Sequence, residues 1–138
     1  MATSKSYTSI EQSKKLAEIL PLESADMHYC LENRDVATGY EIGITSFIRA
    51  KEFEGKCNIV DIKPAWSLAA LFKYLCEIKP QIYTPVLFPS EGKCILQFVK
   101  YGYGNVCEVS CNNPVDACVA MIEKLHKLKM LKHYEIKI

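Results

Sequence analysis

Asn113-Pro114-Val115-Asp116 opens the longest amphipathic segment of this sequence and decides more of the fold than any other stretch. Asn is a strong N-cap, Pro suits the first helical position, and an acid at the third position faces the positive end of the helix dipole. Apolar residues then recur at helical spacing: Cys118, Met121, Ile122, Leu125 and Leu128. This pattern predicts a long helix with one buried face, which ends before a tail at residues 133–138.

The chain has 138 residues, the usual length of one domain, and 17 basic residues oppose 16 acidic ones. We therefore expect a single domain over residues 1–138, with residues 1–7 as a flexible lead-in. A net charge of +1 argues against extensive phosphate contacts, because nucleic-acid affinity comes from neutralising phosphates. No apolar run is long enough for a signal peptide or a membrane span, so we expect a cytoplasmic protein without a membrane partner.

The first half of the chain predicts one helix and two or three strands. Thr8 and Glu11 have the spacing of a capping box at the start of a helix over residues 9–20, which Pro21 ends. Strands are predicted at residues 27–31, at residues 40–45 and, less regularly, at residues 57–62.

The second half predicts a helix, three strands and the long helix. Ser67 is a good N-cap, Trp66 and Leu71 hold the positions of a hydrophobic staple, and Lys79-Pro80 ends the helix. Short connections indicate an antiparallel meander of residues 82–88, 94–99 and 106–111. The fold class is therefore α+β, an antiparallel sheet of about five to six strands packed by three helices, in the order α-β-β-(β)-α-β-β-β-α.

Seven cysteines in a chain of this size and context predict reduced thiols, mostly buried as small apolar side chains. His28 and Cys30 share a face of one strand, and Cys107 and Cys111 share a face of another. If those two strands were neighbours, the four side chains could converge as zinc ligands. A cysteine enzyme is the alternative to a zinc site, and its nucleophile would be Cys118, which lies in the first turns of the last helix. The spacings match no zinc motif and no nucleophile turn, so we expect no metal, no cofactor and no catalytic residues.

Two segments are candidate binding sites. Tyr101 and Tyr103 alternate with glycines in a loop, where they would offer aromatic faces to a partner, although a hairpin turn explains the same residues. Lys127, Lys129 and Lys132 make the end of the last helix basic, which complements the helix dipole and could also contact nucleic acid.

Three segments resemble an uncharacterised family of small proteins from phages and mobile elements of gut bacteria. They are residues 8–22 with 24–27, residues 64–71 and residues 113–118. The resemblance implies a shared fold and a mobile-element origin in the cytoplasm of a bacterial host. It implies no activity, because every matching motif is a cap, a staple, a proline stop or an apolar stripe.

We therefore expect a small accessory protein that binds a host protein or a second copy of itself, without catalysis. The alternative is a regulatory nucleic-acid-binding protein, and the third is a small-molecule or nucleotide-binding protein. If the chain forms a homodimer, strand 106–111 or strand 42–48 is the expected shared edge, because both alternate and carry little charge.

Overall fold

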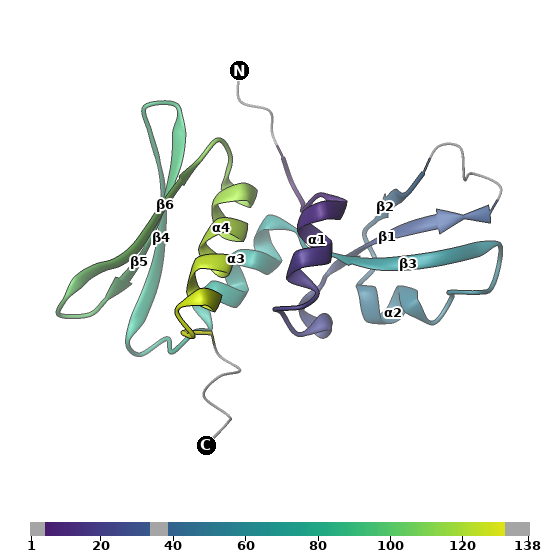
Figure 1. Cartoon of the computed structure of the whole chain (residues 1–138), viewed down its shortest axis with the longest axis horizontal. Helices are drawn as coiled ribbons and strands as arrows, with labels where there is room; N and C mark the ends of the chain where they lie inside the picture. Colours follow the sequence, from purple (N-terminus) through teal and green to yellow (C-terminus); the bar gives the residue numbers. More distant parts are fainter. Residues whose placement is uncertain (1–4, 34–38, 132–138) are drawn as a thin grey trace. The chain divides into compact units, whose positions relative to one another are not determined.

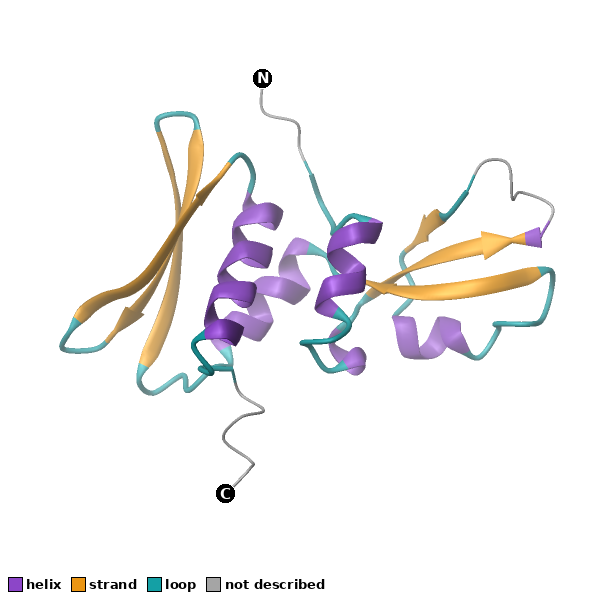
Figure 2. Cartoon of the chain, in the orientation of Figure 1, coloured by secondary structure: helices purple, strands orange, loops and turns teal. Residues whose placement is uncertain are grey.

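The computed structural model describes residues 5–33 and 39–131, which form four α-helices, one 3-10 helix and six strands (Figures 1 and 2). In chain order these are α1 (Ile10–Leu16), η1 (Leu22–Ser24), β1 (Met27–Glu32), β2 (Glu41–Gly43), α2 (Phe47–Lys51), β3 (Ile59–Ala65), α3 (Leu68–Cys76), β4 (Tyr83–Ser90), β5 (Lys93–Lys100), β6 (Gly104–Cys111) and α4 (Pro114–Lys127). Within these ranges no helix has the length and apolar composition that crossing a membrane requires.

The described chain divides into two compact units, and each is described by itself. The N-terminal unit is Tyr7–Ala70, and the C-terminal unit comprises residues 71–131 together with residues 5 and 6. The expectation of one domain over residues 1–138 stays a prediction. The tail at residues 133–138 and the candidate residue Lys132 lie outside the described residues.

The strands form two antiparallel sheets of three, with the orders β2-β1-β3 and β4-β5-β6. The α+β class is confirmed, whereas one sheet of five to six strands is not what the described residues form. Alternation of apolar and polar residues predicts that a segment is a strand but not which strand it pairs with. The division of the six strands into two sheets therefore could not be predicted from the sequence.

The chain also contains a helix, α2, that the sequence pattern did not predict. Strand β2 ends at Gly43, and the segment predicted as strand 42–48 instead turns into α2, with Phe47 and Ala50 buried. Buried residues three apart are typical of one helix face, and the alternation ends before them. Three helices were expected, and the described chain has four.

Helix α1 begins one residue later than the sequence predicted and ends earlier. Ser9, not Thr8, is the N-cap: its hydroxyl accepts from the Gln12 amide at 3.1 Å, and the Gln12 side chain accepts from the Ser9 amide at 3.0 Å. This is a capping box with glutamine in place of Glu11. The regular helix stops at Leu16, ahead of Pro21.

Thr8 is instead the buried polar centre of the N-terminal unit, and its side chain is fully buried. Its amide donates to the Trp66 carbonyl at 3.0 Å, and its hydroxyl accepts from the Trp66 amide at 3.1 Å. The same hydroxyl lies 2.8 Å from the Ser13 hydroxyl, and the Thr8 carbonyl accepts from the Tyr29 hydroxyl at 2.6 Å. One residue therefore connects the N-terminal segment, α1, β1 and the end of β3.

The start of α3 is fixed by side chains from the same unit. The Ser67 hydroxyl accepts from the Ala70 amide at 3.1 Å, which confirms Ser67 as the N-cap. Asp26 accepts hydrogen bonds from both the amide and the hydroxyl of Ser67. The indole of Trp66, which is fully buried, donates to the Ser24 hydroxyl at 2.9 Å.

In the C-terminal unit, α4 packs against β5 and β6 (Figure 1). Leu96 and Phe98 are fully buried on β5, and the Phe98 ring stacks on Tyr83 of β4 at 4.9 Å between centroids. Buried side chains of α4 form the opposing layer: Val115, Ala117, Cys118, Val119, Met121, Ile122 and Leu125. The predicted amphipathic helix and the antiparallel meander are both confirmed.

The predicted cap of α4 is also confirmed. The Asn113 side-chain oxygen accepts from the Asp116 amide at 2.9 Å, and the Asn113 amide group donates to the Asp116 carboxylate at 2.8 Å. Lys5 forms an ion pair with the other oxygen of Asp116 at 2.8 Å. Asn113 therefore caps the helix N-terminus, and Lys5 holds the Asp116 carboxylate of the first turn.

We predict that Tyr29→Phe lowers the free energy of unfolding by about 1–3 kcal/mol, because it leaves the buried Thr8 carbonyl without its donor. Urea denaturation followed by circular dichroism measures the change. Tyr7→Phe is the matched control, since Tyr7 packs edge-on against Tyr29 and its ring is kept. Equal stability of the two variants would show that the Tyr29 bond does not matter.

We predict that Asn113→Ala costs roughly 0.5–2 kcal/mol, because the first turn of α4 loses its side-chain acceptor. Asn113→Ser keeps a capping hydroxyl and should retain most of that stability. Thermal denaturation of both variants provides the comparison. A serine variant as unstable as the alanine variant would indicate that the contact with the Asp116 carboxylate, not the cap, is what matters.

Candidate functional site

Within residues 71–131, no helix covers the face of the β4-β5-β6 sheet opposite α4 (Figure 1). Successive strand residues point to opposite faces. Because Leu96 and Phe98 are buried against α4, the intervening residues of β5 point to the other side. We call this other side the open face.

The pairing register shows which side chains share the open face. Phe88 lies opposite Ile95, Val86 opposite Gln97 and Thr84 opposite Val99, while Glu108 of β6 lies opposite Gln97. Ser110 of β6 lies opposite Ile95. The open face is thus formed by Thr84, Val86, Phe88, Ile95, Gln97, Val99, Glu108 and Ser110. Val86 and Phe88 are 39% and 37% exposed, and Val106, at the irregularity in the β5–β6 pairing, is 43% exposed. The open face therefore combines four apolar side chains, those of Val86, Phe88, Ile95 and Val99, with polar ones, and the described part of this unit leaves it open.

An ordered carboxylate lies within the open face. One oxygen of Glu108 accepts from the side-chain amides of Gln97 at 2.8 Å and Asn105 at 3.1 Å. Two amide donors on one oxygen fix the direction of the carboxylate. The open face thus presents an oriented charge beside aliphatic and aromatic groups, a composition that suits recognition of a polar group on a partner.

Tyr101 and Tyr103 lie in the turn between β5 and β6, as the sequence predicted. Gly102 and Gly104 have φ values of 84° and 92°, which side-chain-bearing residues rarely adopt. Tyr101 is 61% exposed, and its hydroxyl accepts from Thr84 at 2.9 Å, so this ring borders the open face. Tyr103 is 80% exposed, with the Lys100 ammonium 4.5 Å from the ring centroid. A binding role for the two tyrosines stays a prediction.

The lysines are less concentrated than a nucleic-acid-binding surface requires. Lys127 and Lys129 are exposed at the end of α4. Lys93 and Lys100 lie at opposite ends of β5 and, by strand alternation, on opposite faces of the sheet. The Lys124 ammonium donates to the Glu108 carbonyl at 3.2 Å. The described lysines of the C-terminal unit therefore do not form one continuous basic face.

The residues considered for zinc have structural roles or lie in different units. His28 and Cys30 are in β1 of the N-terminal unit, whereas Cys107 and Cys111 are in β6 of the C-terminal unit. The Nδ1 atom of His28 lies 2.7 Å from the Thr45 carbonyl, and its ring lies so close to Gly43 that an added Cβ would be 2.4 Å away. Within residues 5–33 and 39–131 no three histidine, cysteine or carboxylate side chains could together hold a metal ion.

The cysteines are all free, but fewer are buried than the sequence predicted. Cys107 and Cys118 are buried, Cys57 and Cys76 are exposed, and the others are half-buried. Burial, with smaller contributions from neighbouring thiols, raises the pKa of Cys118 to about 12. The Cys118 thiol is therefore protonated at neutral pH and is a poor nucleophile.

Sequence reasoning missed a group of ionisable side chains in the N-terminal unit. Asp61 accepts a short hydrogen bond from the Tyr40 hydroxyl and pairs with Lys63 at 3.2 Å, and the Lys63 ammonium lies 5.6 Å from the Tyr40 ring centroid. Burial works against the charge of Asp61, yet bonds from Tyr40 and Lys63 outweigh it and hold its pKa below 3.8. Bonds to Asp61 raise the pKa of both Tyr40 and Lys63. All three shifts favour the paired states, so this cluster stabilises the structure.

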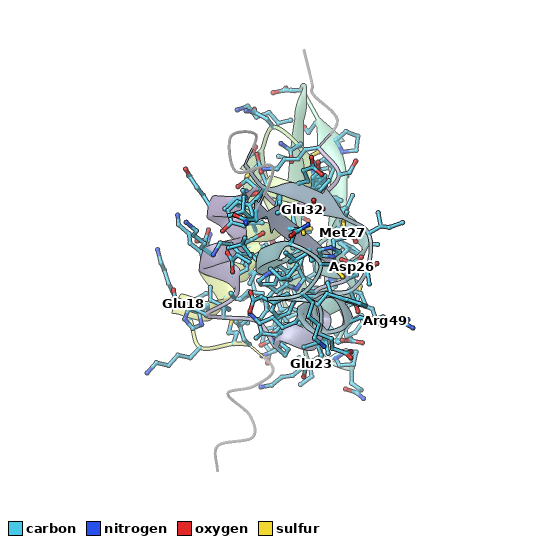
Figure 3. The ribbon with its side chains drawn as sticks, turned by 90° about the vertical axis from the view of Figure 1, so that its right-hand side faces the viewer. Glu18, Glu23, Asp26, Met27, Glu32 and Arg49 are labelled. Carbon is cyan, nitrogen blue, oxygen red and sulfur yellow. The ribbon has the colours of Figure 1, made fainter. Side chains whose placement is uncertain are left out.

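Four other acidic side chains of the N-terminal unit do not converge. Figure 3 shows Glu18, Glu23 and Glu32 pointing to separate parts of the surface, with Asp26 between them. Asp26 is engaged with Ser67. These four carboxylates therefore offer no acid–base pair.

Comparison with known proteins adds no functional information: protein-family models, curated proteins and solved structures give no significant match to this chain. The geometry of its own residues is therefore the basis for any functional inference.

We predict that Asp61→Asn lowers stability at pH 7, because the variant loses the charge that binds Tyr40 and Lys63. A carboxyl with a lowered folded-state pKa stabilises above its unfolded-state pKa, and this contribution disappears as the pH falls through the folded-state value. The difference from wild type should therefore shrink below pH 3.8.

Urea denaturation at pH 7 and near pH 3 measures both values, with the exposed Glu52→Gln as the control from the same unit. A difference of equal size at both pH values would contradict the electrostatic origin.

Proposed function

We propose that this chain is a small accessory protein that acts by binding another protein, through the open face of the β4-β5-β6 sheet. The observation that carries the proposal is the exposure of Val86 and Phe88 side by side with other apolar residues on a face that no described helix of the unit covers. Exposed contiguous apolar side chains with a polar rim are typical of protein interfaces.

The surroundings of the open face support the same reading. Tyr101 and Tyr103 extend from the adjoining turn, and tyrosine is among the residues enriched at interfaces. The ordered Glu108 carboxylate would contribute specificity, because a partner must satisfy it or lose affinity. An apolar centre with an oriented charge and aromatic neighbours suits a protein partner better than a phosphate backbone.

The partner is a host factor or a second copy of the chain. Strand β6 remains the candidate shared edge for a homodimer, because it has one unpaired side and no proline. The other edge, β4, carries Pro85 and Pro89, which cannot donate ladder hydrogen bonds. The alternative shared edge at residues 42–48 is withdrawn, since only Glu41–Gly43 is extended there.

Regulatory nucleic-acid binding is the alternative function, favoured by one observation. Tyr103 is exposed with a lysine beside its ring, and exposed aromatic rings near cations are typical of single-strand binding. The proposed origin in a phage or mobile element of a bacterial host rests on the sequence resemblance and is compatible with both functions. Absence of catalysis and a cytoplasmic location remain part of the proposal.

We predict that a tagged wild-type chain expressed in host cells captures one stoichiometric protein, and that Val86→Lys/Phe88→Lys reduces its recovery at least ~10-fold. The two lysines place charge in the apolar centre of the open face without touching the buried face. Lys127→Glu/Lys129→Glu is the matched control, with two exposed positions at and just beyond the end of α4. Mass spectrometry and the ultraviolet absorbance ratio of the eluates provide the readout.

Equal recovery by the open-face variant, with an unchanged thermal midpoint, would refute the assigned surface. Nucleic acid that washes off with salt and is lost in the α4 variant would establish the alternative. Sedimentation velocity at tens of micromolar distinguishes a second copy from a host factor, because only self-association gives a dimer mass with the pure protein.

A further inference from the structure

Cys94 and Cys111 lie directly opposite each other on the antiparallel strands β5 and β6. Directly opposite residues of an antiparallel pair point to the same face, with Cα atoms about 4.5 or 5.5 Å apart depending on the type of pair. Disulfides span Cα separations of about 4.4–6.8 Å. The register therefore places Cys94 and Cys111 at a Cα separation that a disulfide can span.

Both thiols are free and half-buried, so a small disulfide reagent can reach them. The third cysteine nearby, Cys118 of α4, is fully buried and protonated, and this excludes it as a competitor for exchange. Burial and the neighbouring Asp116 raise the pKa of Cys111 as well, which lowers its thiolate fraction and slows its exchange.

We propose that Cys94 and Cys111 form a reversible disulfide that locks the β5–β6 hairpin when the low-molecular-weight thiol pool becomes oxidised. In the first step one cysteine thiolate attacks a sulfur of oxidised glutathione, which forms a mixed disulfide and releases one glutathione thiolate. The second cysteine thiolate then attacks the protein sulfur of the mixed disulfide and releases the other glutathione. Two protein thiols are oxidised, one glutathione disulfide is reduced, and the two protons pass to the two released glutathione thiolates.

The crosslink would join the start of β5 to the end of β6, immediately before the Asn113 cap of α4. It closes a loop that contains the turn with Tyr101 and Tyr103, and loop closure restricts the unfolded chain. Oxidation would therefore stabilise the C-terminal unit and hold the hairpin that supplies Ile95, Val99 and Glu108 to the open face. The inference rests on the strand register and holds whether or not the open face binds a protein.

We predict that the reduced full-length chain, incubated with oxidised glutathione, gains a peptide crosslinked between Cys94 and Cys111, whereas the exposed Cys57 and Cys76 give mixed disulfides with glutathione. Alkylation, proteolysis without reductant and mass spectrometry identify the crosslink, and dithiothreitol should restore both thiols. The thermal midpoint of the oxidised wild type should rise by several degrees. Cys111→Ser should show a glutathione adduct at Cys94, no crosslink and no rise in the thermal midpoint.

Cys57→Ser is the matched control: it removes an exposed thiol and should leave the crosslink and the rise in midpoint intact. Crosslinked peptides that join other cysteines, or complete alkylation of Cys94 and Cys111 after exposure of the folded chain to excess oxidised glutathione, would overturn the proposal. A crosslink that forms equally in urea would also overturn it, because it would not depend on the strand register.

Discussion

The hydrogen bonds of Thr8 are the constraint on which the N-terminal unit depends. A buried hydroxyl, amide or carbonyl without a partner costs about 1–3 kcal/mol, and Thr8 buries all three with partners for each. Those partners come from β1 and from Trp66 at the end of β3, segments far apart in the sequence. The hydrogen bonds of Thr8 therefore fix the positions of the segment before α1, of β1 and of the connection between β3 and α3.

A different constraint organises the C-terminal unit: successive residues of each strand point to opposite faces of its sheet. One face of β5 carries Leu96 and Phe98 into contact with α4, and alternation obliges the residues between them to point away. Those residues and their neighbours Val86 and Phe88 are more apolar than a solvent-facing sheet needs. A function is expected where a sequence departs from the usual pattern of apolar residues inside and polar residues outside. The apolar residues on the side of the sheet that α4 does not cover are such a departure, and this side is the proposed binding face.

Local signals in the sequence predicted local structure well. The caps Asn113 and Ser67, the apolar stripe of α4 and the turn at Tyr101 all follow from residues within a few positions of one another. The prediction was wrong where the answer depended on distant partners. Thr8 looked like a cap because its bonds to Trp66 are invisible in the sequence, and one sheet was expected because alternation does not specify strand pairing. For the same reason the tyrosines could be proposed from sequence, whereas the open face and the Cys94–Cys111 pair could not.

We propose above all that the open face of the β4-β5-β6 sheet is the surface through which the protein binds its partner. Site-specific photo-crosslinking in host cells tests this most directly, with a benzophenone amino acid in place of Phe88 and, as the reference, in place of the exposed Lys14 of α1. The account predicts one discrete crosslinked species from position 88 and none from position 14. Crosslinking to the same species with equal yield from both positions, or only from position 14, would contradict it.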